Sequence, residues 1–122
     1  MAEQDKVGFV DALFTGGIWR TPGVIEQPEI RVVRWRVFEV LDGPRRGERH
    51  IVAYHELGAE GRVSTEIIEV DLPTRRCFTA SGRIYHLDGP AGFDRDAQYV
   101  WSWWADANAV SAEKDVSQEF EA

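Results

Sequence analysis

The sequence predicts an α+β domain in which an antiparallel meander sheet of about five strands packs against one C-terminal amphipathic helix. Two observations lead to this prediction. Residues 30–87 contain runs of β-branched and aromatic residues separated by short turn sequences, which is typical of strands joined in a meander. Residues 94–107 carry apolar residues at helical spacing, and such an apolar stripe needs a sheet face to cover it.

The size and composition predict a single domain over residues 1–122. The chain is close to the commonest domain length, and 43% hydrophobic residues suffice for one core without a metal or disulfide. The single cysteine, Cys77, excludes an intrachain disulfide and a multi-cysteine zinc site. The polar start of the chain lacks a signal-peptide pattern, and no apolar run approaches the roughly 18–20 residues of a membrane span. We therefore expect a soluble, cytoplasmic protein without membrane contact.

A lead-in segment, residues 1–29, precedes the strands. It contains four apolar residues on one helical face, Phe9, Val10, Leu13 and Phe14. Gly16 and Gly17 follow directly, so we expect a short N-terminal helix that ends at these glycines. The next apolar residues, Ile18 and Trp19, are expected to pack on the main body of the domain.

Two strands are predicted first, over Ile30–Leu41 and Arg49–Leu57. Ile30–Leu41 is dense in β-branched and aromatic residues, which favours a long strand. Arg49–Leu57 has consecutive apolar residues without clean alternation, as expected of a strand in the middle of a sheet. The turn between them, which begins at Asp42-Gly43-Pro44, is short enough for an antiparallel hairpin.

Three more strands complete the predicted meander. Arg62–Asp71 changes its apolar phase at Ile67-Ile68, which indicates a bulge or a stretch buried on both faces. Cys77–Ala80 and Arg83–Leu87 flank Ser81-Gly82, a typical two-residue hairpin turn.

The helix is predicted over residues 94–107, with Asp94 as its N-cap. At about 100° per residue, its inward stripe contains Ala97, Val100, Trp101, Trp104, Ala107 and Asn108. The acidic tail, residues 109–122, is expected either to be mobile or to add a short edge element.

Charge is distributed unevenly along the chain, whose net charge is −7. Residues 31–50 carry six arginines and three acidic groups, a balance of +3, whereas residues 93–122 carry two basic and seven acidic groups, a balance of −5. A uniformly basic surface, the usual sign of non-specific nucleic-acid binding, is absent. Basic proteins are therefore more plausible partners than nucleic acids or anionic membranes.

Several residues have the chemistry of catalytic or ligand sites, but none has a specific pattern. Four carboxylates on the predicted strands could act in acid–base catalysis, although solvated charges explain them equally well: Glu56, Glu66, Glu69 and Asp71. The three histidines, His50, His55 and His86, lack metal-ligand spacing. Cys77 is expected to pack in the core, and the glycine-rich loop within residues 87–94 lacks the lysine of a phosphate-binding loop. We assign no catalytic, cofactor-binding or metal-binding residue.

Two surface features suggest binding instead. Tyr99 and Trp103 fall outside the inward stripe of the helix, and an exposed Tyr–Trp pair is a common anchor of protein interfaces. The alternative is that the lead-in segment covers both rings. The second feature is a group of arginines that a hairpin would bring to one edge, Arg34, Arg36, Arg45, Arg46 and Arg49, together with Arg31. A solvated sheet face would also explain these arginines.

These features predict a non-enzymatic protein-interaction module, an inhibitor or regulatory subunit that binds a protein partner through an aromatic and charged surface. One alternative is a small-ligand-binding domain or enzyme with its site between sheet and helix. A second alternative is a nucleic-acid-associated factor that uses the arginine-rich hairpin.

Overall fold

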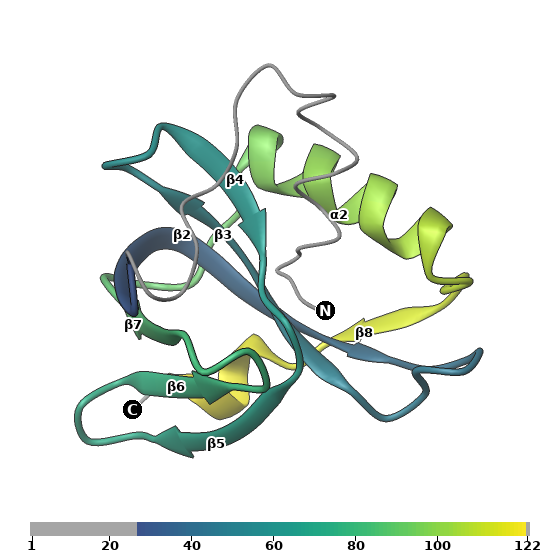
Figure 1. Cartoon of the computed structure of the whole chain (residues 1–122), viewed down its shortest axis with the longest axis horizontal. Helices are drawn as coiled ribbons and strands as arrows, with labels where there is room; N and C mark the ends of the chain where they lie inside the picture. Colours follow the sequence, from purple (N-terminus) through teal and green to yellow (C-terminus); the bar gives the residue numbers. More distant parts are fainter. Residues whose placement is uncertain (1–26, 122) are drawn as a thin grey trace.

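The computed structural model describes residues 27–121, which form a bent sheet, one long helix and a short C-terminal helix (Figure 1). The expected helix at residues 9–14 and the rest of the lead-in segment up to residue 26 lie outside the described residues. The elements are β2 (Glu29–Val40), β3 (Arg49–His55), β4 (Glu60–Val63), β5 (Ile67–Asp71), β6 (Arg76–Thr79), β7 (Ile84–Leu87), α2 (Arg95–Ala107), β8 (Glu113–Asp115) and the 3-10 helix η1 (Ser117–Phe120).

The α+β class is confirmed, but the predicted antiparallel meander of five strands is only roughly right. The described strands form one seven-stranded sheet in the order β4-β3-β2-β7-β6-β5, and β8 pairs with β2. β2 and β7 are parallel, whereas the other pairs are antiparallel. The sheet is mixed because β5, β6 and β7 form a second meander whose last strand lies beside the first half of β2.

The predicted third strand, Arg62–Asp71, is in fact two strands. β4 pairs with β3, and β5 pairs with β6, so the two segments lie at opposite ends of the strand order. The pairing of β5 with β6 shifts register between Ile67 and Glu69, and Ile68 is exposed. Of the two expectations for Ile67-Ile68, an irregular pairing therefore holds and burial on both faces does not. The change of apolar phase therefore coincides with an irregular pairing at the start of β5, just after the short link from β4.

A bulge in β2 also changes which side chains face inward. The register with β3 shifts between Val33 and Arg36, and Arg34 has a positive φ of 45°. Ile30 and Val32 therefore share a buried cluster with residues of the opposite parity, Trp35 and Val37. Val33 and Leu41 would share a face with Trp35 and Val37 in a regular strand, but they lie outside this cluster. One extra residue inverts the faces on either side of a bulge.

Among residues 27–121, the buried apolar side chains form two clusters, on opposite faces of β2 and β3. The first lies between the two halves of the bent sheet and η1; its main members are Ile30, Val32, Trp35, Val37, Ile51, Ala53, Cys77, Tyr85, Leu87, Val116 and Phe120. The second lies between the sheet and α2, which crosses the outside of β3 and β4 (Figure 1). Its members are Phe38, Val40, Val52, Val63, Ala97, Val100, Trp101, Trp104, Ala105 and Val110.

α2 confirms the predicted helix closely. The side chain of Asp94 accepts a hydrogen bond from the Ala97 amide at 3.0 Å, which makes it the N-cap. Within the inward stripe, Ala105 is buried in place of Ala107, which is exposed. β4 approaches the first turn of α2 so closely that a Cβ at Gly61 would lie 2.5 Å from backbone atoms of Asp96 and Ala97. Within residues 27–121, no helix is long and apolar enough to cross a membrane.

The tail adds a short element, one of its two expected arrangements. β8 is antiparallel to the end of β2, and Val116 and Phe120 are buried in the first cluster. Asp42 attaches the start of the tail, because its carboxylate accepts hydrogen bonds from the Ser111 hydroxyl and from the amides of Ser111 and Ala112.

Candidate functional site

The outward face of α2 carries the two aromatic residues that the sequence singled out. Tyr99 is 57% exposed and Trp103 is 46% exposed. Their ring centroids lie 6.4 Å apart in an edge-to-face arrangement with an interplanar angle of 71°. The two residues are four positions apart, so adjacent helical turns bring them together. Both rings also have further interactions within the chain.

Phe93 adds a third exposed aromatic ring immediately before the helix. It is 60% exposed and lies 5.2 Å from the guanidinium carbon of Arg36, measured to the ring centroid. Acidic and basic residues accompany the aromatics on the outer surface of α2, since Arg95, Asp96 and Asp106 are all exposed. This surface therefore combines apolar area with charge of both signs.

Arg34 and Arg36 lie on β2 near the start of α2 rather than in an open basic patch. Arg34 forms an ion pair with the N-cap residue Asp94, at 2.9 Å. Arg36 donates a hydrogen bond to Gln98 Oε1 at 2.7 Å and stacks on Phe38, 4.7 Å from the ring centroid. Burial lowers the pKa of Arg36. Both arginines thus join β2 to the beginning of the helix.

Two arginines of the β2–β3 hairpin, Arg45 and Arg49, also have acidic partners in the chain. Arg49 lies 2.9 Å from Glu39 and 2.9 Å from Glu119 of η1, and these acidic groups raise its pKa although partial burial opposes the effect. Arg46 is exposed and has no ion pair among residues 27–121. The charges of Arg45 and Arg49 are therefore partly neutralised by acidic residues of the same chain. The hairpin does not present a uniformly basic surface.

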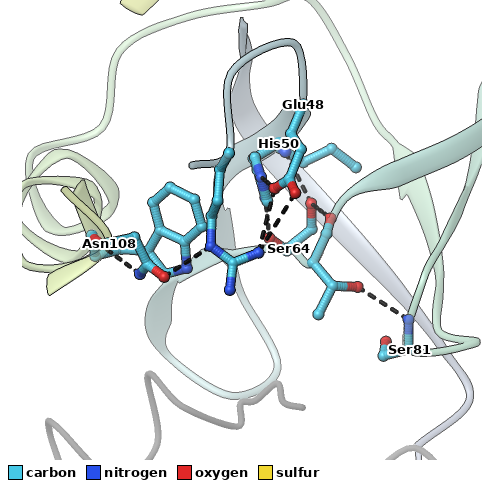
Figure 2. Close-up of polar contacts among 9 residues, drawn as sticks. Glu48, His50, Ser64, Ser81 and Asn108 are labelled. Atoms are coloured by element: carbon cyan, nitrogen blue, oxygen red, sulfur yellow. Dashed lines mark hydrogen bonds and ion pairs between the residues drawn. The ribbon is translucent and has the colours of Figure 1, made fainter. Parts of the chain in front are cut away.

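A polar cluster that sequence reasoning missed lies beside Trp104, and Figure 2 shows three of its members, Glu48, His50 and Asn108. We define this Trp104 polar cluster as Arg45, Glu48, His50 and Asn108. His50 Nε2 lies 2.8 Å from Glu48 Oε1, and His50 Nδ1 lies 2.7 Å from the backbone oxygen of Ser64. Arg45 Nε donates to Asn108 Oδ1 at 2.8 Å. The only sequence signal was the Glu48–His50 spacing, since residues two apart on an extended strand face the same side.

A second buried polar group lies at the end of the β3–β4 hairpin. Glu60 Oε2 is 3.2 Å from Arg62 Nη1 and 3.7 Å from His55 Nδ1. All three side chains are buried, and Glu60 Oε2 has no hydrogen bond of good geometry. The adjacent turn fits tightly against them, because a Cβ at Gly58 would lie 2.8 Å from His55 Nδ1.

The carboxylates considered for catalysis do not form a site. Glu56 and Glu69 are exposed, and Asp71 lies 3.4 Å from Arg76 in an ion pair across β5 and β6. Glu66 uses its backbone oxygen to accept the Ala80 amide. Glu56 lies beyond β3, in a different half of the sheet from the other three. The arrangement provides no matched acid and base.

The remaining candidates are the Cys77 thiol, the glycine-rich loop and a metal site. Burial raises the pKa of the Cys77 thiol to about 12, which disfavours the reactive thiolate. In the glycine-rich loop, the Gly89 carbonyl accepts hydrogen bonds from Trp35 Nε1 and Arg75 Nη2, both at 2.9 Å. Among residues 27–121, no cluster of three potential ligand side chains could hold a metal ion.

Comparison with known proteins adds no assignment to this geometry: no family model, no curated protein and no solved structure matches the chain.

Proposed function

We propose that this chain is a non-enzymatic protein-interaction module that binds a protein partner through the outer surface of α2. The observation that carries the proposal is the exposure of Tyr99 and Trp103, at 57% and 46% of their surfaces, on a helix whose opposite face is anchored in the core. Tyr and Trp are enriched among the residues that dominate binding energy at interfaces. An inhibitor or regulatory subunit is the role that fits such a surface.

The alternatives have less support. A small-ligand or catalytic site between sheet and helix would need room there, but Phe38, Trp101 and Trp104 pack in that layer, with the Phe38 and Trp101 ring centroids 5.0 Å apart. A nucleic-acid site on the hairpin would need free cations, but Arg45 and Arg49 contact acidic groups of the same chain. These observations favour the helix surface over both alternatives.

The proposal can be tested by affinity purification with mass spectrometry, using the wild type and the double variant Tyr99→Ala/Trp103→Ala. The matched control is Ile68→Ala, because Ile68 is a comparably exposed apolar residue on β5, away from α2 (Figure 1). We expect one partner to be retained by the wild type and the control and lost by the double variant. For the purified partner, each anchor should contribute about 2 kcal/mol or more, equivalent to roughly a 30-fold change in Kd.

Circular dichroism of the double variant is part of the same experiment. A folded double variant that retains the partner would contradict the proposal. If the double variant unfolds, the two rings serve the core and the interface lies elsewhere. If it binds normally while an Arg45/Arg46/Arg49 triple alanine variant loses binding to a nucleic acid, the nucleic-acid alternative replaces the proposal.

A further inference from the structure

We propose that the contact between Glu48 and His50 is a proton-dependent switch that holds the turn before β3 against the C-terminal end of α2. His50 lies on β3 and is 1% exposed. Both of its ring nitrogens lie close to oxygen atoms: Nδ1 is 2.7 Å from the Ser64 backbone oxygen, and Nε2 is 2.8 Å from Glu48 Oε1 (Figure 2). The inference is independent of the proposed partner.

Counting hydrogens shows that this arrangement needs an extra proton. A neutral imidazole has one N–H, and a backbone carbonyl can only accept. Nδ1 of His50 must therefore carry a hydrogen toward Ser64. The contact between Nε2 and Glu48 then needs a second hydrogen, because otherwise a nitrogen lone pair would face an ionised carboxylate. The folded cluster thus holds one proton more than a neutral His50 beside an ionised Glu48.

The surroundings favour the extra proton on His50 rather than on Glu48. The His50 ring centroid lies 4.4 Å from that of Trp104, and an aromatic ring stabilises a nearby cation. Arg45 Nη1 lies 3.4 Å from Glu48 and favours the ionised carboxylate. Burial acts to raise the pKa of Glu48, but the hydrogen bond from His50 and the charges of His50 and Arg45 together bring it below its ordinary value. These contacts together favour the imidazolium form of His50.

The protonated pair is connected to the end of α2. Glu48 contacts Arg45, whose Nε donates to Asn108 Oδ1 at 2.8 Å. Asn108 is the C-cap of α2, and its Nδ2 donates to the Trp104 carbonyl at 2.8 Å. The Arg45 guanidinium carbon also lies 5.7 Å from the Trp104 ring centroid. A change at His50 can therefore reach the last turn of the helix through two contacts, the Trp104 ring and the Glu48–Arg45 pair.

Among residues 27–121, Glu48 is the charged residue whose side chain contacts the His50 ring. The turn before β3 presents Glu48 and Arg45, and α2 presents aromatic rings and the amide of Asn108. β2 presents Phe38, opposite His50 in the strand register. Arg36 stacks on Phe38, 4.7 Å from its ring centroid, and Asp115 of β8 is opposite Phe38 on its other side. The state of the switch thus depends mainly on Glu48 and His50 themselves.

The pH response follows from these contacts. When His50 loses its second proton as the pH rises, Nε2 and the Glu48 carboxylate become two facing acceptors, so the turn separates from the helix end. Protonation of Glu48 at acidic pH also removes the ion pairs with His50 and Arg45. The cluster is therefore closed at intermediate pH and opens toward either extreme.

The test uses the full chain and two NMR measurements. Ring-nitrogen spectra at pH 7 should show both nitrogens of His50 protonated in the wild type. In Glu48→Gln, the glutamine amide can donate to an unprotonated Nε2, so His50 should be neutral with the same contacts. Amide exchange protection at Asn108 should fall about tenfold as wild-type His50 deprotonates, the expected loss for one charge-assisted hydrogen bond, and should stay constant in Glu48→Gln.

A matched control is the exposed pair of His86 and Glu29, whose Nε2 and Oε1 atoms lie 2.7 Å apart. Glu29→Gln should leave the protection of α2 unaltered. The proposal is overturned by a neutral His50 in the wild type at pH 7, by an imidazolium that persists in Glu48→Gln, or by α2 protection that does not follow the His50 titration. If Glu48→Gln does not fold, the wild-type titration alone decides between these outcomes.

Discussion

At the scale of single residues, buried charge is the feature that hydropathy could not predict. Arg62 and Glu60 are about as buried as the apolar residues around them, at 5% and 8% exposed. Charged residues are almost never fully buried unless they are paired, and here the ion pair and His55 supply that pairing. Their burial depends on the pairing of β3 with β4, which brings Glu60 opposite His55.

The Glu60–Arg62 pair leads to a prediction about stability. Glu60→Ala should lower the free energy of unfolding by about 3–5 kcal/mol, because it leaves the Arg62 charge buried without its partner. The double variant Glu60→Leu/Arg62→Leu should be much closer to the wild type, since it removes both charges. Urea denaturation monitored by tryptophan fluorescence measures both effects. A double variant no more stable than Glu60→Ala would show that the unpaired charge of Arg62 is not the cause of the lost stability.

At the scale of elements, α2 is the most predictable part of the chain and β2 the least. The stripe of Ala97, Trp101 and Trp104 follows from helical spacing alone, and all three residues are buried. In β2 the two-residue alternation does not continue across Arg34, because the bulge is a change in the backbone that the apolar pattern does not show. Helical periodicity tolerates local irregularity better than the two-residue period of a strand, in which one extra residue exchanges the faces.

A substitution at Trp104 tests whether this side chain anchors α2 in the core. Trp104→Ala should destabilise the domain by about 3–5 kcal/mol, the usual cost of removing a buried aromatic side chain. The effect should exceed that of Trp103→Ala on the same helix, because Trp104 is 6% exposed and Trp103 is 46% exposed. Thermal melting followed by circular dichroism provides the comparison. Equal melting temperatures for Trp104→Ala and the wild type would contradict the role of Trp104 as a core anchor.

At the scale of the whole molecule, the tail joins parts of the chain that are distant in sequence. β8 forms a strand pair with the end of β2, and Phe120 is buried in the first core cluster. Glu119 forms an ion pair with Arg49. The same charges that suggested a basic hairpin and an acidic tail therefore partly neutralise each other within the molecule. A partner that recognises charge would meet a more balanced surface than the sequence segments imply.

The attachment of the tail predicts an acid-dependent loss of stability. The hydroxyl and amide hydrogen bonds from Ser111, with that of the Ala112 amide, lower the pKa of Asp42 despite some desolvation. This contribution is fully present above the ordinary carboxyl pKa and is lost as the pH falls through the lowered one. Asp42→Asn should therefore be less stable than the wild type at pH 7 and should lose less stability on acidification.

Urea denaturation between neutral pH and pH 3 measures this difference. Asp88→Asn is the matched control, because Asp88 is an exposed aspartate in the loop between β7 and α2, and its stability should follow the wild-type curve. Parallel curves for Asp42→Asn and the wild type would contradict the assignment of the acid-sensitive contact to Asp42.

By itself, the sequence determined the α+β class, the position of the long helix with its cap at Asp94, and the location of most strands. Those features depend on local periodicity, turn residues and capping, which can be recognised within a few residues of sequence. The parallel pairing of β2 with β7, the two-sided core, and the neighbours of His50 and Glu60 became known from the folded structure. The reason is that these contacts join residues far apart in the chain, so their partners are chosen by the folded sheet and not by the local pattern.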